Sequence, residues 1–312
     1  MSIAHYRISK LGKLCLSLLI LKSHKLIGIT AKEIVMSFNR MLSFLVIAVL
    51  VFTACVSVIK EAPQQEEAVE LTEAEKAEAF FNDGNVYYSE GNYDLAISDY
   101  SKAIEINPKF DEAYNNRGSA YQNRGNDGLA MSDYSKAIEI NPKNAGAYYN
   151  RGSAYQKKAS YDLAISDYSK VIEISQSNAD AYYNRGIAYQ KKGGYDLAIS
   201  DYSKTIEINP NNADAYYNRG TAYQKKSSYT LAISDYSKAI KIKPDNADAY
   251  FNRGNAYFKK GDDNRAISDY SKAIKINPMY EQAYYNRGTA YQRKGDYDRS
   301  ISDFDKVIEM KK

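Results

Sequence analysis

The segment 179–212, ADAYYNRGIAYQKKGGYDLAISDYSKTIEINPNN, decides the fold of this chain. Its first half places Tyr182, Gly186 and Tyr189 four and three residues apart, which is the spacing of one stripe along a helix. A glycine pair then interrupts that helix and a second helical stripe follows. Pro210 ends the second helix, because proline cannot continue a helix interior. The segment therefore predicts an antiparallel pair of helices, with Tyr182 and Tyr189 in the core.

The same pattern recurs with a period of 34 residues, and one glycine marks each copy: Gly84, Gly118, Gly152, Gly186, Gly220, Gly254 and Gly288. A lone pair of short helices cannot bury its own apolar face, so neighbouring copies must stack on one another. We therefore predict an all-α solenoid of seven helix-turn-helix repeats over 77–312. The predicted repeats are 77–110, 111–144, 145–178, 179–212, 213–246, 247–280 and 281–312.

This pattern resembles the tetratricopeptide repeat family. The signature positions of that family correspond to Tyr182, Gly186, Tyr189, Ala198, Tyr202, Thr205 and Pro210. Thr205 replaces the usual alanine in this copy, and Arg185 stands where the family usually has leucine. The resemblance implies a right-handed superhelix whose concave wall is built from the first helix of each pair.

Composition argues against catalysis and nucleic-acid binding. Both histidines and Cys15 precede Cys55, so the chain beyond Cys55 has neither His nor Cys. Most metal sites and nucleophile–histidine arrangements are thereby excluded, and we predict no enzyme, metal or cofactor. Residues 1–54 hold seven of the 42 basic residues and one of the 38 acidic ones, which leaves 35 basic and 37 acidic residues from Cys55 onward. A nucleic-acid binder should carry a basic excess on its folded domain.

The N-terminal part indicates export. Residues 41–59 carry no charge, are preceded by Arg40, and are long enough to span a bilayer. The run contains VFTAC, which resembles the lipobox of bacterial lipoproteins and makes Cys55 the expected lipidated residue. Phe52 departs from the usual leucine, so an uncleaved anchor helix and an ordinary signal peptide remain alternatives. We expect a membrane-anchored protein of the bacterial cell envelope that faces the periplasm or the exterior.

The remaining segments before the repeats divide as follows. Residues 1–35 are read as an extended gene prediction or a basic cytoplasmic lead, because Met36 starts a compact signal over 36–59. Residues 60–76 contain Pro, Gln and Glu without an apolar stripe, and they are predicted to be an acidic tether.

Two ladders of side chains are predicted on the concave wall. One is made of amides, Asn116, Asn150, Asn184, Asn218, Asn252 and Asn286, with Gln156, Gln190 and Gln224 further along the same wall. The other is aromatic, Tyr149, Tyr183, Tyr217, Phe251 and Tyr285. Amides suit the backbone of an extended peptide, and tyrosine is a frequent hot-spot residue. We predict a protein or peptide partner here, although recent duplication alone would also repeat these residues.

Other surfaces receive plainer interpretations. Basic pairs such as Lys191-Lys192 end the first helices, and acids such as Asp201 are expected to offset them on a solvated surface. At the positions where repeats that clamp acidic chaperone tails carry lysine and arginine, this chain has tyrosine and asparagine, so activity of that kind is not expected. The chain ends soon after its last helix, so Val307, Ile308 and Met310 are expected to be partly bare, which makes a self-assembling structural protein the alternative function.

Overall fold

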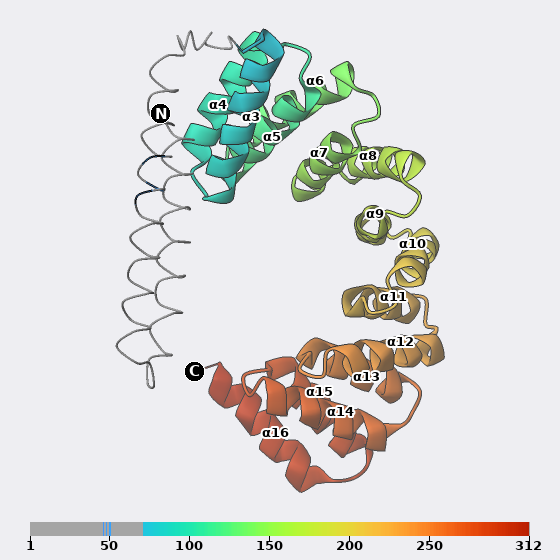
Figure 1. Ribbon diagram of the computed structural model, residues 1–312. Helices are drawn as coiled ribbons and strands as arrows, with labels where there is room; N and C mark the ends of the chain where they lie inside the picture. The colour runs from blue at the N-terminus through green and yellow to red at the C-terminus, as the bar shows by residue number, and fades with distance from the viewer. Residues whose placement is uncertain (1–45, 47, 49, 51–70, 312) are drawn as a thin grey trace, which may run out of the picture. The chain divides into compact units, whose positions relative to one another are not determined.

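The computed structural model describes residues 46, 48, 50 and 71–311, and the chain divides into two units at Glu70 and Leu71. Residues 71–311 hold fourteen α-helices and no strand, which confirms the predicted all-α solenoid (Figure 1). The helices are α3 (Glu73–Ser89), α4 (Tyr93–Ile106), α5 (Asp111–Asn123), α6 (Asp127–Ile140), α7 (Ala145–Lys157), α8 (Tyr161–Ile174), α9 (Ala179–Lys191), α10 (Tyr195–Ile208), α11 (Ala213–Lys225), α12 (Tyr229–Ile242), α13 (Ala247–Lys259), α14 (Asp263–Ile276), α15 (Glu281–Arg293) and α16 (Tyr297–Met310).

Most of the N-terminal predictions lie outside the described residues. This holds for Cys55, for the lead at 1–35, for all of 36–59 except Val46, Ala48 and Leu50, and for the tether up to Glu70. Within the described residues, no helix combines the length and the hydropathy needed to cross a membrane.

The first helix begins earlier than its sequence pattern suggests. α3 starts at Glu73, so the last four residues assigned to the tether are helical. The cause is a capping box, in which the Thr72 hydroxyl accepts from the Glu75 amide at 3.2 Å while the Glu75 carboxylate accepts from the Thr72 amide at 2.8 Å. The Thr-x-x-Glu spacing is a readable start signal, and it outweighs the absence of an apolar stripe.

Local signals set the bounds of each helix pair. At the start of α9 the Asn178 side chain accepts from the Ala181 amide at 2.9 Å, which satisfies one of the free N-terminal donors. After α9 the chain turns through Gly193, whose φ of +82° is a left-handed conformation that favours glycine. α10 ends at Ile208, two residues before Pro210.

The pairs stack so that the first helices form one wall. Within the described residues, each first helix packs against the next first helix, as α9 does against α11, whereas successive second helices have no Cα atoms within 8 Å of one another. In Figure 1, α7, α9 and α11 accordingly lie on the inner side of the arc and α8, α10 and α12 on the outer side. The concave wall implied by the resemblance is therefore made by the first helices.

The fully buried aromatic residues come from the second helices: Tyr100, Tyr134, Tyr168, Tyr202, Tyr236 and Tyr270. Each lies against the marker glycine of its own repeat, and a Cβ added at Gly186 would lie 2.8 Å from Cε1 of Tyr202. The prediction that Tyr182 and Tyr189 fill the core is thus only partly right, since both are half-buried. Burial raises the pKa of the core hydroxyls, and that of Tyr134 reaches about 12.

An arginine network lies beside Tyr182 and Tyr189. The guanidinium carbon of Arg185 lies 5.7 and 5.8 Å from their ring centroids. Arg185 donates twice to the Asp201 carboxylate at 2.8 Å, and donates to Ser169 Oγ of the preceding repeat at 2.9 Å. Arg185, which replaces the family leucine, therefore links the two helices of its own repeat and also links that repeat to the preceding one.

The same network occurs in six repeats, formed by Arg117 with Asp133, Arg151 with Asp167, Arg185 with Asp201, Arg219 with Asp235, Arg253 with Asp269 and Arg287 with Asp303. The expectation that these aspartates offset the basic pairs is wrong, because the arginines bind them. Lys192 and Lys226 instead pair with Asp162 and Asp196 of the preceding repeat.

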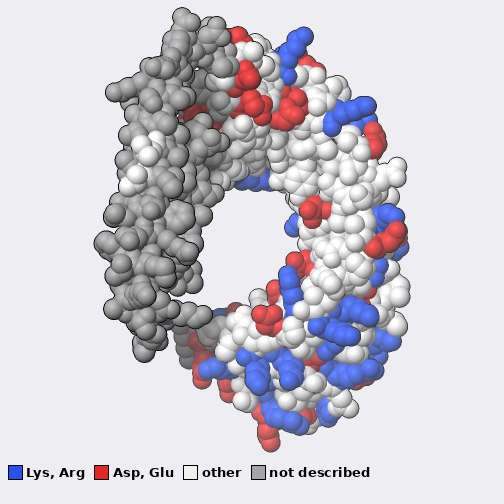
Figure 2. Space-filling model, in the orientation of Figure 1, with Lys and Arg blue, Asp and Glu red and all other residues white. Residues whose placement is uncertain are grey.

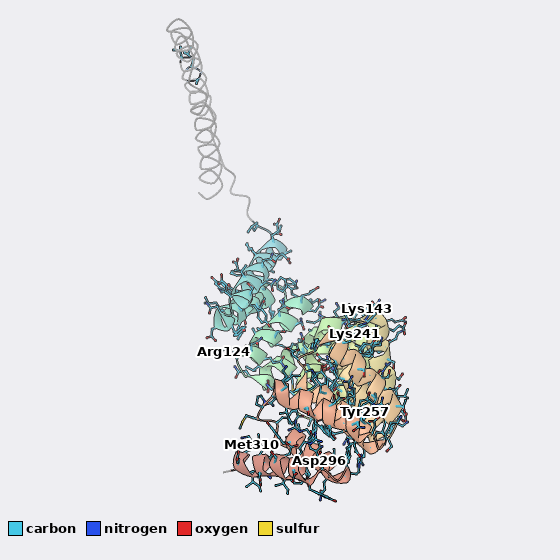
Figure 3. The ribbon with its side chains drawn as sticks, turned by 90° about the horizontal axis from the view of Figure 1, so that it is seen from below. Arg124, Lys143, Lys241, Tyr257, Asp296 and Met310 are labelled. Carbon is cyan, nitrogen blue, oxygen red and sulfur yellow. The ribbon has the colours of Figure 1, made fainter. Side chains whose placement is uncertain are left out.

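The last helix carries an open face. Asp296 and Met310 mark the two ends of α16 (Figure 3). Val307 is buried, contrary to the expectation that it would be partly bare, because it points toward α15. Ile308 is 54% exposed and Ile301 is 58% exposed, since α15 is the only described helix that packs against α16.

Candidate functional site

The two predicted ladders meet one another in the structure. Nδ2 of Asn184, of Asn218 and of Asn252 donates to a tyrosine hydroxyl of the preceding repeat, at 2.9, 2.8 and 2.8 Å. The acceptors are Tyr149, Tyr183 and Tyr217, respectively. Each bond spans 35 residues and joins neighbouring first helices, so these side chains help to hold the repeats together.

The other three asparagines have different partners because the tyrosine is missing. Asn116 and Asn286 follow repeats with Phe81 and Phe251 at that position, which offer no hydroxyl. They donate instead to the side-chain oxygens of Asn85 and Asn255, at 2.9 and 2.8 Å. Asn150 follows a repeat with Asn115 at that position, and donates to its Oδ1 at 3.0 Å.

The aromatic ladder is half-buried along most of its length. The Tyr149 ring lies 5.7 Å from the ring of the core residue Tyr168, and Tyr217 lies 5.8 Å from Tyr236. Burial raises the pKa of the Tyr149 and Tyr217 hydroxyls. Tyr285 is 56% exposed, because it belongs to the last repeat and has no following asparagine to cover it.

The amide ladder keeps its oxygen atoms free. Within the described residues no hydrogen bond reaches Oδ1 of Asn184, Asn218 or Asn252. These atoms are not completely buried, because the only completely buried side-chain N or O atom without a partner in this part of the chain is Oε1 of Gln156. Each asparagine is therefore held by its nitrogen and presents an acceptor on the wall.

Glutamines further along the wall serve the core. Oε1 of Gln190 accepts from the Tyr202 hydroxyl at 3.0 Å, and Oε1 of Gln224 accepts from Tyr236 at 2.9 Å. These two glutamines therefore satisfy buried tyrosines, which uses one of the two acceptor sites on each oxygen atom.

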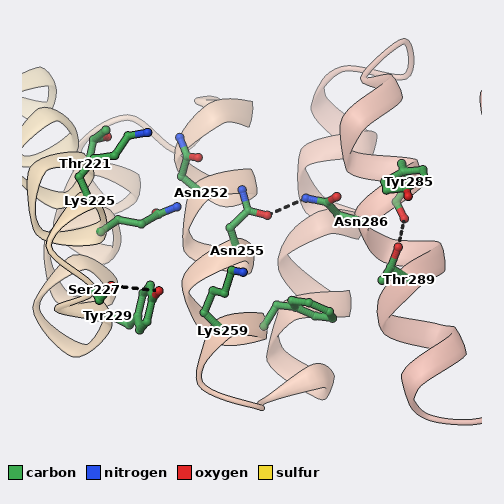
Figure 4. A pocket seen from close by; sticks show the side chains of 12 residues that line it. Thr221, Lys225, Ser227, Tyr229, Asn252, Asn255, Lys259, Tyr285, Asn286 and Thr289 are labelled. Carbon is green, nitrogen blue, oxygen red and sulfur yellow. Dashed lines mark hydrogen bonds between the residues drawn. The ribbon is translucent and has the colours of Figure 1, made fainter. Parts of the chain in front are cut away.

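The wall is hollowed at two places. A cavity of about 670 Å³ lies across α11, α13 and α15, and its lining includes Asn252, Asn286 and Tyr285 (Figure 4). A smaller one of about 180 Å³ lies near the other end of the array and includes Asn116 and Asn150. The remaining predicted residues line neither of these two cavities: Asn184, Asn218, Tyr149, Tyr183, Tyr217 and Phe251.

The larger cavity, hereafter the repeat-6 cavity, also contains residues that sequence reasoning missed. Lys225 and Lys259 lie at the ends of α11 and α13, and Asn255 and Phe258 lie on α13. Asn255 stands where five of the other copies have Ser, Ile or Thr, and Phe258 stands where the same five have Gln. The first repeat departs in the same way, with Asn85 and Tyr88. A column-by-column comparison of the copies, with attention to these departures, would have found them.

Charge is distributed unevenly along the array. Residues 77–144 carry eleven acidic and six basic side chains, whereas 213–280 carry seven acidic and twelve basic ones. In Figure 2, red atoms gather over the first repeats and blue atoms over the later ones. Among the described residues, no group of His, Cys, Asp and Glu side chains could hold a metal ion.

Stacked helix pairs with a continuous inner wall define the class of α-solenoid repeat proteins. A family model described as TPR repeat matches residues 84–125, 123–158, 160–193, 225–261 and 254–295. Two further models are described as Tetratricopeptide repeat. One matches residues 179–212 and 281–312, and the other matches 202–234. The chain belongs to the tetratricopeptide repeat family, whose members are generally non-catalytic scaffolds for protein–protein interaction.

A search of the curated proteins found no match. Among solved structures, the chain is similar to the TPR protein YrrB, with 27% identity, a TM-score of 0.56, and coverage of 60% of this chain and 97% of that one. It is similar to MamA, with 30% identity, a TM-score of 0.52, and coverage of 54% and 92%. The C-terminal part of a TPR protein from Cytophaga hutchinsonii, 21% identical over 74% and 95% with a TM-score of 0.64, shares the fold.

Proposed function

We propose that this protein is a non-catalytic scaffold of the bacterial cell envelope, held at a membrane through its N-terminal segment, and that it binds an extended peptide of a partner protein on its inner wall. The observation that carries the proposal is the row of free Oδ1 atoms on Asn184, Asn218 and Asn252. An extended peptide offers backbone N–H donors that such acceptors bind.

The tyrosine hydroxyls prepare this row for binding. Each hydroxyl holds the amide nitrogen of the asparagine in the next repeat, so the oxygen is already oriented before a ligand arrives. Side chains that are ordered in advance lose less conformational entropy on binding. YrrB, to which this chain is similar, is a TPR protein with an unusual peptide-binding site, and that likeness supports a peptide as the ligand.

A pull-down from envelope extract tests the proposal. The triple variant Asn184→Ala, Asn218→Ala and Asn252→Ala removes the three acceptors, but it also breaks three inter-repeat hydrogen bonds. The matched control is Tyr149→Phe, Tyr183→Phe and Tyr217→Phe, which breaks the same bonds, keeps the rings, and leaves the amides in place. We expect the asparagine variant to lose partner capture, and the tyrosine variant to retain most of it with a smaller loss, because its amides are no longer oriented in advance. Capture by the asparagine variant at the wild-type level would refute the inner-wall mechanism.

Self-assembly through the last repeat is the second candidate function. The observation that favours it is the bare stripe of Ile301 and Ile308 on α16. Sedimentation of the wild type and of the variant Ile301→Asp with Ile308→Asp tests it. A concentration-dependent increase in mass that the variant lacks would support self-assembly, and a monomer at all concentrations would exclude it.

A further inference from the structure

The repeat-6 cavity has an excess of hydrogen-bond donors without partners. Oδ1 of Asn255 accepts from both the Tyr270 hydroxyl at 2.9 Å and Asn286 at 2.8 Å, so its oxygen is fully used. Its Nδ2 donates no hydrogen bond within the described residues and can serve a ligand. Asn255 thus adds a free donor to the lining of this cavity.

The two lysines of the cavity lack the acidic partner found elsewhere. Lys157, which ends α7, lies 3.4 Å from Asp127, and Arg293, which ends α15, pairs with Asp263. The residues that correspond to these acids are Tyr195 for Lys225 and Tyr229 for Lys259, and neither can neutralise a lysine. Lys225 and Lys259 therefore form no ion pair within the described residues. In Figure 4 the Lys225 side chain extends from α11 toward α13, where Asn252, Asn255 and Lys259 lie.

Acidic groups on the same helices are engaged elsewhere. At the other end of α11, Asp214 pairs with Lys243 at 3.0 Å. At the other end of α13, Asp248 accepts from the Tyr280 hydroxyl at 2.5 Å. The fifth and sixth repeats together also carry the basic excess of the array. A ligand that supplies negative charge and acceptors is therefore favoured at this cavity.

The cavity also offers aromatic surface. Phe258 and Tyr229 both line it, and Phe258 replaces a glutamine that in other repeats faces the core tyrosine. The guanidinium carbon of Arg293 lies 3.7 Å from the Phe258 ring centroid and fixes that ring from the side of α15. An aromatic or aliphatic side chain of a ligand could pack beside Phe258 next to the two charges.

We propose that the repeat-6 cavity binds an acidic peptide segment, with carboxylates of Asp, Glu or a chain end at Lys225, Lys259 and Asn255, and with an apolar side chain against Phe258. This inference rests on the proposed function, and it names the class of peptide. It also predicts that the peptide binds most strongly to the part of the wall formed by repeats 5 to 7.

Fluorescence anisotropy with the full chain in detergent tests the proposal. The probe is an acetylated, fluorescein-labelled peptide of sequence Gly-Glu-Phe-Glu-Phe-Glu-Gly, and the reference is the same peptide with Gln in place of each Glu. We expect the wild type to prefer the Glu peptide by about tenfold or more, a preference that falls as salt rises. Lys225→Ala with Lys259→Ala should remove most of this preference.

Lys158→Ala with Lys191→Ala is the matched control. Both lysines are exposed, form no ion pair within the described residues, and lie outside the cavity, so the control removes the same charge and should bind as the wild type does. Phe258→Gln, which introduces the residue that five of the other six repeats carry, should weaken binding of the Phe-containing probe more than of a probe with Ser in place of Phe.

Three results would overturn the inference. They are equal binding of the Glu and Gln peptides, equal loss in the two lysine variants, and tighter binding of a labelled ten-residue oligouridylate, which would indicate a nucleic-acid site. The proposed function is judged separately: if the asparagine variant loses partner capture while the lysine variant retains it, the acidic-peptide inference fails and the inner-wall scaffold stands. If both retain it, both fail.

Discussion

The interaction between Arg185 and Asp201 is expected to be a main source of stability in the fourth repeat. The Asp201 side chain is 6% exposed and that of Arg185 is 19% exposed. Two hydrogen bonds of 2.8 Å join them, and they raise the pKa of Arg185, with burial opposing this less strongly. The pair is therefore largely removed from water, and its two groups depend on each other.

Removing either partner alone leaves a charge without compensation. For a buried pair this typically costs about 3–5 kcal/mol, so we expect that loss of unfolding free energy for Asp201→Ala and for Arg185→Leu. Replacing both partners removes the cost of taking the two charges out of water together with the attraction between them. Such exchanges often change the unfolding free energy very little. The double variant should therefore lie within about 1–2 kcal/mol of the wild type, since leucine is also the usual family residue here.

Equilibrium urea unfolding of the two single variants and the double variant, followed by circular dichroism, measures the coupling as a double-mutant cycle. Lys204→Leu with Glu207→Ala is the control, because that ion pair has a similar distance of 2.7 Å but lies on the exposed face of α10. The control should unfold at the wild-type urea concentration. Two results would refute the reasoning. They are single variants that are as stable as the wild type, and a double variant that loses as much unfolding free energy as the two single variants together.

Three further predictions concern packing, pH and the anchor. Gly186→Leu should cost about 1–3 kcal/mol or more, because its Cβ would lie 2.8 Å from Tyr202, whereas Gly146→Leu, whose nearest neighbour atom lies 3.4 Å away, should melt near the wild type. Burial raises the pKa of Tyr100 and Tyr134 to about 12. The stability that their neutral hydroxyls contribute is therefore complete below the ordinary tyrosine pKa near 10 and is lost as pH rises through 12. Thermal melts between about pH 8 and 12 whose melting temperature does not decrease above about pH 10 would contradict this. If Cys55 is lipidated, labelled palmitate should enter the wild type and not Cys55→Ser, and a mature protein that keeps residues 41–59 would favour the uncleaved anchor.

The fold could be predicted from the sequence because its signal is repeated seven times. A fixed 34-residue spacing of glycine, with proline after the second helix, leaves few arrangements other than stacked helix pairs. Burial within a pair was harder to predict, because Tyr182, Tyr189 and Tyr202 all lie on apolar stripes. Only the position of Tyr202 opposite Gly186 makes it the fully buried one, and that is a contact across two helices.

The polar contacts were out of reach of the sequence for a related reason. Arg185 and Asp201 are 16 residues apart and lie on different helices, and each taken alone suits a solvated surface. The bond between Asn218 and Tyr183 crosses a repeat boundary, so no single-helix pattern contains it. The role of the two ladders in binding stays a prediction, but the free acceptor on each asparagine comes from the structure.

The two ends of the array bear on whether copies of this chain would stack. Inside the array, each arginine reaches a serine of the preceding repeat, as Arg287 does to Ser271 at 2.9 Å. At the C-terminal end Asp305 takes the place of that serine, and at the N-terminal end Asp83 takes the place of the arginine. If a second copy stacked in register, Asp305 of one copy would face Asp83 of the other, and the two carboxylates would repel each other. Every internal boundary from Ser101 onward has a hydrogen bond between an arginine and a serine at that place. The bare isoleucines of α16 alone would favour head-to-tail growth, but this repulsion opposes it, and the inner wall therefore remains the better-supported surface for a partner.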